Sequence, residues 1–254
     1  MKLDAIVLAG GQSGHDLYEI TQTKERALLP IAGRPMVLWV IEALLASDLV
    51  KRIIVVGDIA TLASCAFPAA VSIVSGGATL LESLQRGLAE VQAAQKVFIA
   101  SADIPLLTGQ TVRDFFAATL PGTADLYYPI VTKAIMDQTF RTTKRTYVKL
   151  KDGLFTGGNL FLANPAVLPQ CIKQADYLFQ HRKQPVALCR FLGFSFLLRF
   201  LAGQLSLSHI EERASALLGF QGAVINGPFP LVAMDIDKAA DLETATAFLR
   251  RLPN

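Results

Sequence analysis

Short apolar runs alternate with amphipathic segments along the first part of the chain. The apolar runs are continuous, as in strands buried on both faces, and they fall at 4–8, 52–57, 71–74 and 97–100. The amphipathic segments predict helices at 36–46, 78–94 and 109–119. Buried strands that alternate with helices indicate an α/β fold, in which a Rossmann-like, mixed but mostly parallel sheet is flanked by helices.

The pattern is less regular after residue 120. Short apolar runs predict strands at 126–131, 146–150, 159–162 and 231–233. Residues 165–218 are mostly helical by their spacing, Ser208 and Glu211 stand three apart as in a capping box, and a final helix is expected at 238–251. Because neither a repeat nor a flexible linker interrupts the chain, we expect one domain, 1–254, with a mainly helical elaboration at about 165–220.

Composition narrows the class of protein. Of 254 residues, 52% are hydrophobic and 18% are charged, so the chain has enough apolar side chains for a core and too few charges for disorder. The formal net charge of +3 is too even to indicate a nucleic-acid surface, so no nucleic-acid partner is expected. Three cysteines without a CxxC pair favour neither a disulfide framework nor a zinc site, and free thiols fit the cytoplasm.

One segment raises the question of a membrane. Residues 186–202 are strongly apolar, but Arg190 and Arg199 interrupt them, and a spanning helix needs about 20 predominantly apolar residues. We therefore expect no membrane partner, with an interfacial helix as the lesser alternative. The phenylalanines at 191, 194, 196 and 200 are expected in the core, although the apolar segment also fits an interface, which leaves a homodimer open.

A glycine cluster, Gly10, Gly11 and Gly14, follows the first strand. Glycines permit close approach of a ligand to the backbone, whose N–H groups can bind anionic oxygens, although a plain tight turn explains them equally well. The Walker pattern GxxxxGK[ST] is absent, and the spacing is not GxGxxG. About twenty polar residues are expected before the next helix, and Asp58 lies well beyond the ~20 residues of the dinucleotide fingerprint. An NAD(P)-dependent oxidoreductase is therefore a disfavoured alternative.

Several segments, taken in order, resemble one group of enzymes. They are IVLAGGQS at 6–13, RALLPIAGRPM at 26–36, GGATLLESLQRGL at 76–88, SADIPLL at 101–107, TGGN at 156–159 and DIDKAADL at 235–242. In this order they resemble the MobA-like nucleotidyltransferases, the superfamily that includes molybdenum-cofactor guanylyltransferases and the sugar-phosphate and methylerythritol-phosphate cytidylyltransferases. Several motifs in one order are more specific than any single one of them.

The resemblance implies transfer of a nucleoside monophosphate from an NTP, with CTP the first choice, to a small phosphorylated acceptor, with release of pyrophosphate. The nucleotide-binding residues that it implies are Leu8, Ala9, Gly10, Gly11, His15, Lys24 and Arg26 for the triphosphate, and Gly76, Gly77 and Ser83 for the base. His15 stands where the family usually has Arg, and Arg26 where it has Lys. These departures motivate an alternative, a nucleotide-binding protein of the same fold with little or no catalysis.

The resemblance also implies Mg²⁺ as cofactor. Asp103 and Asp237 are its expected ligands, because Mg²⁺ uses one or two carboxylates together with substrate phosphates. Asp235 is the alternative to Asp237, and either of them would serve equally well as a cap of the final helix. Arg26, Asp103 and Lys149 are the expected catalytic residues, and no general base is required because an acceptor phosphate is already ionised.

Positive charge is concentrated at 133–151, where six Lys and Arg residues stand against Asp137 alone, for a net +5. Local basic clusters attract phosphates. We therefore expect this segment, through Lys149, to face the acceptor phosphate together with Gly158 and Asn159. The alternative for each of these residues is a position in a solvated loop.

Overall fold

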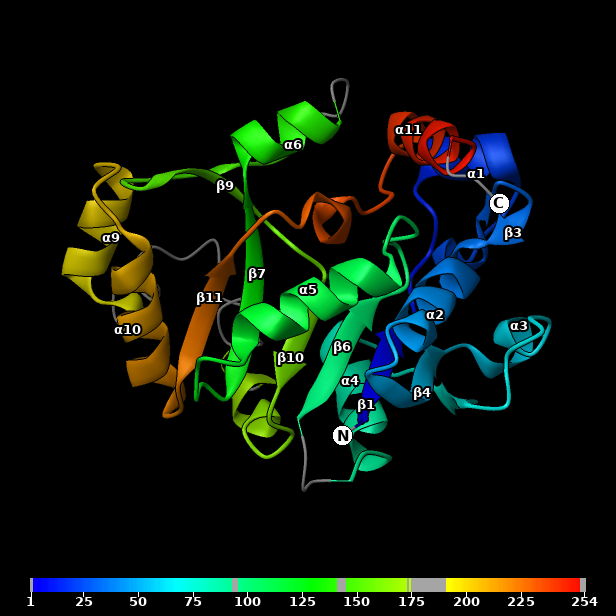
Figure 1. The fold of residues 1–254 in the computed structure, drawn as a ribbon, viewed down its shortest axis with the longest axis horizontal. Coiled ribbons are helices and arrows are strands. Elements are labelled where there is room, and N and C mark those ends of the chain that lie inside the picture. The colour runs from blue at the N-terminus through cyan, green and yellow to red at the C-terminus, as the bar shows by residue number, and fades with distance from the viewer. Residues whose placement is uncertain (1, 93–95, 141–144, 173, 175–190, 252–254) are drawn as a thin grey trace.

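A nine-stranded mixed sheet runs through the computed structural model, which describes residues 2–92, 96–140, 145–172, 174 and 191–251 (Figure 1). The strand order is β5-β4-β1-β6-β10-β7-β9-β8, and β11 pairs with β7. The strands are β1 (Leu3–Leu8), β4 (Val50–Gly57), β5 (Val71–Ser75), β6 (Val97–Ser101), β7 (Leu126–Thr132), β8 (Val148–Leu150), β9 (Gly153–Gly157), β10 (Leu160–Ala163) and β11 (Gly222–Asn226). Two further strands, β2 (Pro30–Ile31) and β3 (Arg34–Pro35), form a separate hairpin.

Helices cover both faces of the sheet, and Figure 1 shows α2 and α5 in front of it and α4 behind. The α-helices are α1 (His15–Thr21), α2 (Met36–Ala46), α3 (Ile59–Leu62), α4 (Leu80–Ala89), α5 (Gly109–Thr119), α6 (Lys133–Thr139), α9 (Phe194–Leu201), α10 (Leu207–Leu218) and α11 (Ala239–Leu249). Short 3₁₀ helices are formed by Arg26–Leu28 and Pro230–Ala233. The predicted mixed, mostly parallel α/β sheet flanked by helices is confirmed, since β5, β4, β1 and β6 are parallel neighbours and β10 and β9 are antiparallel.

The strands carry continuous apolar runs because a separate hydrophobic core packs against each face of the sheet. Ala5 and Val7 of β1 pack in the cluster that contains residues of α2 and α5, whereas Ile6 packs in the cluster on the α4 side. Successive side chains of a strand point to opposite faces, so a strand covered on both faces needs apolar residues at every position. Each fully buried aliphatic side chain of this kind contributes roughly 1.5–3 kcal/mol through the hydrophobic effect.

The strand pairing is irregular beside the end of β6. Strands β9 and β10 follow one another along the same edge of β7, and residues 158 and 159 interrupt them. Gly158 N still donates to Pro129 O of β7 (2.9 Å), whereas Asn159 N donates outside the sheet, to Val232 O (2.7 Å). This break places the TGGN segment next to the chain that follows β6.

Three local predictions are wrong. Residues 231–233 belong to a 3₁₀ helix that starts at Pro230, which fixes φ and cannot donate to a sheet, and the last strand is instead β11. Helix α1 begins directly after Gly14, so no long polar loop separates the glycines from the next helix. The capping box of α10 uses Ser206 and His209 rather than Ser208 and Glu211.

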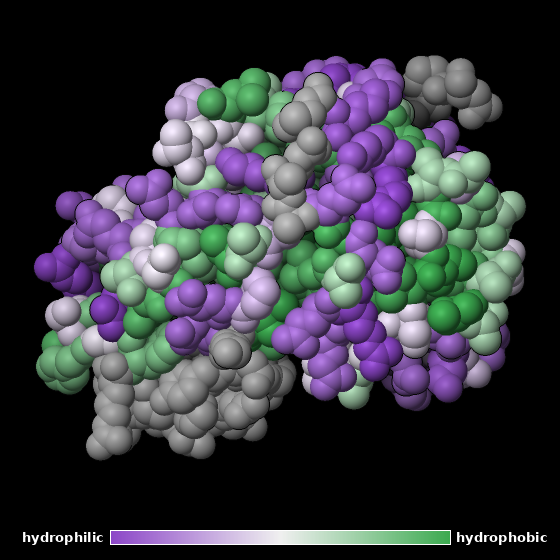
Figure 2. Space-filling view, turned by 90° about the horizontal axis from the view of Figure 1, so that it is seen from below, coloured by the Kyte–Doolittle hydropathy of each residue, from purple (hydrophilic) through white to green (hydrophobic). Residues whose placement is uncertain are grey.

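The end of the molecule that carries α9 departs from the expected core. Phe194 and Phe200 are 67% and 44% exposed, so their expected burial is wrong. Seen from below, the surface shows hydrophobic areas separated by hydrophilic ones, and hydrophobic residues reach the left edge, where Figure 1 places α9 (Figure 2). Within the described ranges, no helix combines the length and apolar character needed to cross a bilayer.

Candidate nucleotide site

The glycine loop lies between the end of β1 and residues 24–26, to which it is hydrogen-bonded. Arg26 N donates to Gly11 O (2.9 Å), and Ser13 N donates to Lys24 O (2.7 Å). Gly11 has φ 154°, a backbone conformation that residues other than glycine rarely adopt. A Cβ built at this position would meet no atom within 4 Å. None of the hydrogen bonds among the described residues uses the N–H of Gly10 or Gly11. Because Gly10 and Gly11 also line cavities, their backbone donors are free to bind a ligand there.

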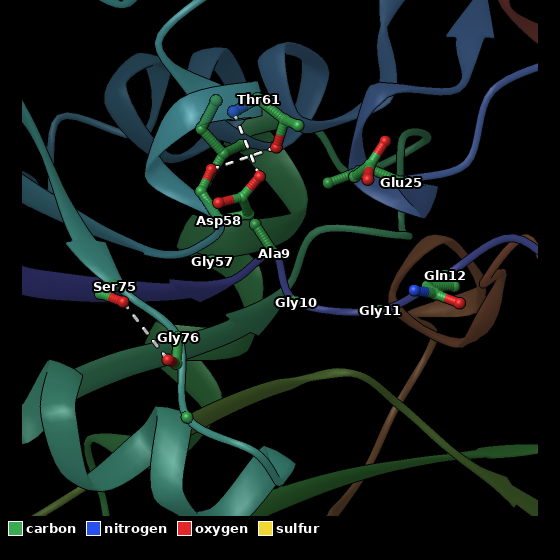
Figure 3. Close-up of a pocket in the computed structure, with 13 residues that line it drawn as sticks. Ala9, Gly10, Gly11, Gln12, Glu25, Gly57, Asp58, Thr61, Ser75 and Gly76 are labelled. Carbon is green, nitrogen blue, oxygen red and sulfur yellow. Dashed lines mark hydrogen bonds between the residues drawn. The ribbon is translucent and has the colours of Figure 1, made fainter.

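Two cavities, of about 280 and 290 Å³, lie on either side of this loop and share Ala9, Gly10, Gly11 and Ala27. The first extends between the ends of β4 and β5 and is drawn in Figure 3. The second extends toward the end of β6, where Leu8, Arg26 and Asp103 line it. Together they form a cleft along the carboxyl edge of the parallel strands, which is where sheets of this type bind ligands.

The first cavity carries acceptors and no Lys or Arg among its lining residues. Glu25 and Asp58 contribute carboxylates from opposite walls (Figure 3). Asp58 also caps α3, because its Oδ2 accepts from Thr61 N (3.3 Å). The side of the cavity formed by Glu25 and Asp58 suits a ligand group that donates hydrogen bonds, whereas the side formed by Gly10 and Gly11 carries backbone donors.

Gly76 and Gly77 form the floor of this cavity and depend on Ser83. Gly77 N donates to Ser83 Oγ (3.0 Å), and Ser83 is buried, with only 5% of its surface exposed. A Cβ on Gly77 would stand 2.3 Å from Glu82 Cβ, so only glycine fits there. Ser83 therefore supports the glycine turn from within the protein, and the alternative of a solvated serine is wrong.

Three charged groups meet beside the second cavity. Arg26 Nη1 donates to Asp237 Oδ1 (2.7 Å) and lies 3.4 Å from Asp103 Oδ2. The side chains of Arg26, Asp103 and Asp237 are 30%, 16% and 49% exposed, so the cluster opens to solvent on the side of Asp237. The two carboxylates expected to bind metal therefore both contact the same nitrogen atom of Arg26, and only this cationic group lies between them.

This arrangement fits a divalent cation. Asp103 Oδ1 and Arg26 Nε are buried and lack hydrogen-bond partners, which is costly unless a ligand satisfies them. Within the described chain no three His, Cys, Asp or Glu residues are placed to hold a metal together. Two carboxylates with substrate phosphates complete an Mg²⁺ site without a third protein ligand.

Asp235 has a different partner from Asp237. Arg145, whose side chain is only 9% exposed, forms an ion pair with the Asp235 carboxylate, and its Nη2 donates to Asp235 O (2.6 Å). Burial, together with the nearby Asp103 and Asp237, raises the pKa of Asp235 to about 6 against the opposing effect of Arg145. Neither Asp235 nor Asp237 caps α11, because the N-cap residue is Lys238, and Asp241 Oδ2 accepts from the backbone N of Asp237 and of Lys238.

A third cavity, of about 280 Å³, adjoins this cluster and contains the TGGN segment. Its lining residues are Tyr128, Arg145, Thr146, Thr156, Gly157, Gly158, Asn159, Asp235, Asp237, Lys238 and Asp241. Because Asp237 lines this cavity and contacts Arg26, which lines the second cavity, the walls of the two cavities are joined by this ion pair. Lys238 is an exposed cation on its wall.

The structure brings some predicted site residues together and leaves others apart. Leu8, Ala9, Gly10, Gly11, Arg26, Gly76, Gly77 and Asp103 line the first two cavities, and Gly158, Asn159 and Asp237 line the third. His15 points away, with an 87% exposed side chain near Glu19 (3.5 Å). Lys24 and Lys149 line none of these cavities, and the Lys149 side chain instead passes Gly203, with Cε 4.0 Å from a Cβ built there.

The basic segment at 133–151 is dispersed. Lys133 pairs with Asp137 (2.5 Å), Arg145 pairs with Asp235, and Arg141 and Lys144 lie outside the described residues. Sequence reasoning missed Glu25, Asp58, Arg145 and Lys238 as lining residues. A usable signal existed for Asp58, which follows β4 as Asp103 follows β6, and for Lys238, which adjoins Asp237.

The protein thus has an α/β fold with a candidate nucleotide site at the carboxyl edge of its sheet. There, a glycine loop with unused backbone N–H groups lies beside two carboxylates. The model of the MobA-like NTP transferase domain matches residues 5–188. A solved hypothetical transferase from Thermus thermophilus shares 38% identity and a TM-score of 0.83, over 95% of this chain and 100% of its own. The chain therefore belongs to the MobA-like NTP transferase family.

More distant structures share the fold. A 2-C-methyl-D-erythritol 4-phosphate cytidylyltransferase, also from Thermus thermophilus, is 15% identical, with a TM-score of 0.56 over 98% of this chain and 100% of that chain. The 4-diphosphocytidyl-2C-methyl-D-erythritol synthase from Anaerococcus prevotii is 13% identical, with a TM-score of 0.58 over 98% of this chain and 99% of that chain. A search of curated proteins found no match.

Proposed function

We propose that the protein transfers a nucleoside monophosphate from an NTP to a small phosphorylated acceptor and releases pyrophosphate. The observation that carries this proposal is the position of Asp103 and Asp237 on Arg26 Nη1, between the cleft of the glycine loop and the cavity of the TGGN segment. Membership of a nucleotidyltransferase-type family supports the reaction class. The same membership argues against the oxidoreductase alternative.

The triphosphate is assigned to the glycine loop and Arg26. The N–H groups of Gly10 and Gly11 donate to phosphate oxygens, and the open space above Gly11 admits a phosphate close to the backbone. Arg26 supplies the cation, and its Nε has no hydrogen-bond partner in the free protein. Positioned donors of this kind stabilise the charge that collects on the leaving pyrophosphate.

Asp103 and Asp237 are assigned to Mg²⁺. One oxygen of each carboxylate contacts the same nitrogen of Arg26. Asp103 Oδ1 has no hydrogen-bond partner and is available to a metal ion. When bound, Mg²⁺ would neutralise charge on the phosphates that adjoin these carboxylates. In its absence Arg26 offsets one of the two negative charges, so the cluster of Arg26, Asp103 and Asp237 keeps a net negative charge in the free protein.

The acceptor is assigned to the third cavity. Gly158, Asn159 and Lys238 line its wall, and Lys238 suits a phosphate. An oxygen of the acceptor phosphate attacks the α-phosphorus, the bond from the α-phosphorus to the bridging oxygen breaks, and pyrophosphate leaves with that electron pair. A phosphate monoester is largely ionised at pH 7, so the protein has no proton to remove from the nucleophile.

The base is assigned to the first cavity, with CTP favoured. Glu25 and Asp58 accept hydrogen bonds there and cannot donate them when ionised, so a base with an exocyclic amino group suits the cavity. Cytosine has such a group and is smaller than a purine. Uracil lacks it, so UTP is expected to be the poorest substrate.

The test is pyrophosphate release from CTP, GTP, ATP and UTP, each combined with a panel of phosphorylated sugars, polyols and alcohols in the presence of Mg²⁺. Calorimetric titration with the same nucleotides runs alongside it. Release with at least one pair, and weakest with UTP, supports the proposal. Tight nucleotide binding without release for any acceptor contradicts it and supports the alternative of a binding protein, which the outward position of His15 favours.

A further inference from the structure

The α9 helix presents an apolar face to solvent. Phe194, Leu198 and Leu201 stand at i, i+4 and i+7, which places them on one side of a helix, and they are 67%, 48% and 73% exposed. Phe196 lies on the other side, packed with Leu205 and its neighbours. Exposed apolar side chains gathered on one face are typical of a surface that meets another molecule.

Beside this face, α9 and α10 enclose a cavity of about 350 Å³ with two guanidinium groups on its wall. Arg199 contacts His209, and Arg213 Nη2 donates to Phe191 O (2.7 Å). Among the described residues neither arginine pairs with a carboxylate, although Glu212 also lines the cavity. Arg213 Nε is buried and has no hydrogen-bond partner. Two guanidinium groups without a carboxylate partner among the described residues, together with an unsatisfied donor, favour an anion in this cavity.

Further positive charge adjoins the end of α9. Lys149 passes beside Gly203, and Lys151 N donates to Leu205 O (2.9 Å); both lysine residues are exposed. The acidic neighbours are Glu212, which lines the cavity, and Asp152, whose Oδ2 accepts from Leu207 N (2.9 Å). An apolar face with cations around it suits an anionic partner, whereas a second copy of this face would bring like charges together.

We propose that α9 docks on an anionic lipid surface, with its Phe194, Leu198 and Leu201 face in the interface and a lipid phosphate in the cavity between α9 and α10. A phosphate carried by an apolar group satisfies both features at once. This surface is distinct from the nucleotide cleft, since none of its residues lines the three cavities described above. The proposal needs no nucleotide and stands whether or not the proposed function does.

The test is co-sedimentation of the full chain with vesicles of phosphatidylcholine alone and of phosphatidylcholine mixed with phosphatidic acid. Binding to the mixed vesicles only is expected. The double variant Phe194→Ser/Leu201→Ser should weaken it about tenfold or more, through lost apolar burial, and Arg199→Gln about fivefold, through one lost charge. Because all three side chains are at the surface, circular dichroism should show an unchanged fold.

Two variants serve as matched controls. Leu120→Ser removes a 65% exposed leucine at the end of α5, and Arg250→Gln removes an exposed arginine at the end of α11; both should bind vesicles like the wild type. Equal binding to neutral and mixed vesicles, or none to either, overturns the proposal. A dimer in sedimentation velocity that Leu201→Ser dissociates also overturns it. Binding of inorganic phosphate by the protein without any binding to vesicles does so as well.

Discussion

Arg26 and Asp237 stand 211 positions apart in the chain, yet Arg26 Nη1 and Asp237 Oδ1 are 2.7 Å apart. The contact joins the segment that follows the glycine loop to the segment that precedes the last helix. The same nitrogen reaches Asp103 at 3.4 Å, so three distant parts of the sequence converge on one cation. In the proposed reaction this convergence brings the triphosphate, the metal ligands and the acceptor cavity to the same place.

Arg26 should be essential for catalysis through its charge. Arg26→Gln removes the proposed triphosphate cation, and turnover should fall about 100-fold, as when one preorganised donor of an active site is lost. Arg26→Lys restores a cation and should recover most of this loss, although its shape and reach differ. Steady-state pyrophosphate release measures both variants.

Arg34→Gln is the matched control for this experiment. Arg34 pairs with Glu42 at 2.8 Å outside the three cavities, and its removal should leave turnover unchanged. A loss of activity in Arg34→Gln as large as in Arg26→Gln, or full activity in Arg26→Gln, would contradict the assignment of Arg26.

Asp235 should make the stability of the metal-free protein depend on pH. Burial raises the pKa of its carboxyl to about 6, above the ordinary 3.8, so between these values the folded protein holds a proton that the unfolded chain releases. The free energy of unfolding therefore falls as pH rises through this window. Asp235→Asn removes this term, so its stability relative to wild type should improve by on the order of 2 kcal/mol from pH 4 to pH 7.

Urea unfolding in the presence of a chelator measures this difference at each pH. Asp114→Asn, on the exposed side of α5, should show a difference from wild type that does not change with pH. A difference for Asp235→Asn that is equally flat would mean that the carboxyl is ionised throughout and that Arg145, rather than burial, controls it.

The Gly77 turn should tolerate no side chain. A Cβ at Gly77 would stand 2.3 Å from Glu82 Cβ, so Gly77→Ala should lower the free energy of unfolding by about 1–3 kcal/mol and distort the proposed base cavity. Gly222→Ala is the control, since a Cβ there meets nothing within 4 Å. Thermal unfolding of the two variants compares them directly, and equal melting temperatures would show that the turn adapts.

Much of the fold could be predicted because its strands are covered on both faces. Runs such as Ile53–Val56 are apolar at every position, and the helix at 109–119 has the bounds expected from its spacing. The position of Asp103 followed from the same pattern, since the carboxyl ends of parallel strands meet at one edge. The motif order added Gly10, Gly11 and Arg26, which line the cleft.

The remaining features depend on contacts that local spacing does not encode. Asp237 reaches Arg26 from a segment that follows a 3₁₀ helix, where a strand was expected at 231–233. The charge of the segment at 133–151 suggested a phosphate surface, but Arg145 turns inward to Asp235 and Lys149 lies beside Gly203. The phenylalanines of α9 are apolar, yet Phe194 faces solvent, because apolar character alone does not separate a core face from a docking face.

The central claim is that Asp103 and Asp237 together hold a divalent ion beside a bound triphosphate. Electron paramagnetic resonance titration of Mn²⁺ into the complex of the protein with CTP measures this directly, with Asp114→Asn as the control. Asp103→Asn and Asp237→Asn should each weaken Mn²⁺ binding about tenfold or more, while their circular dichroism and that of the control stay unchanged. Mn²⁺ binding equal to that of the wild type in both site variants would contradict the account.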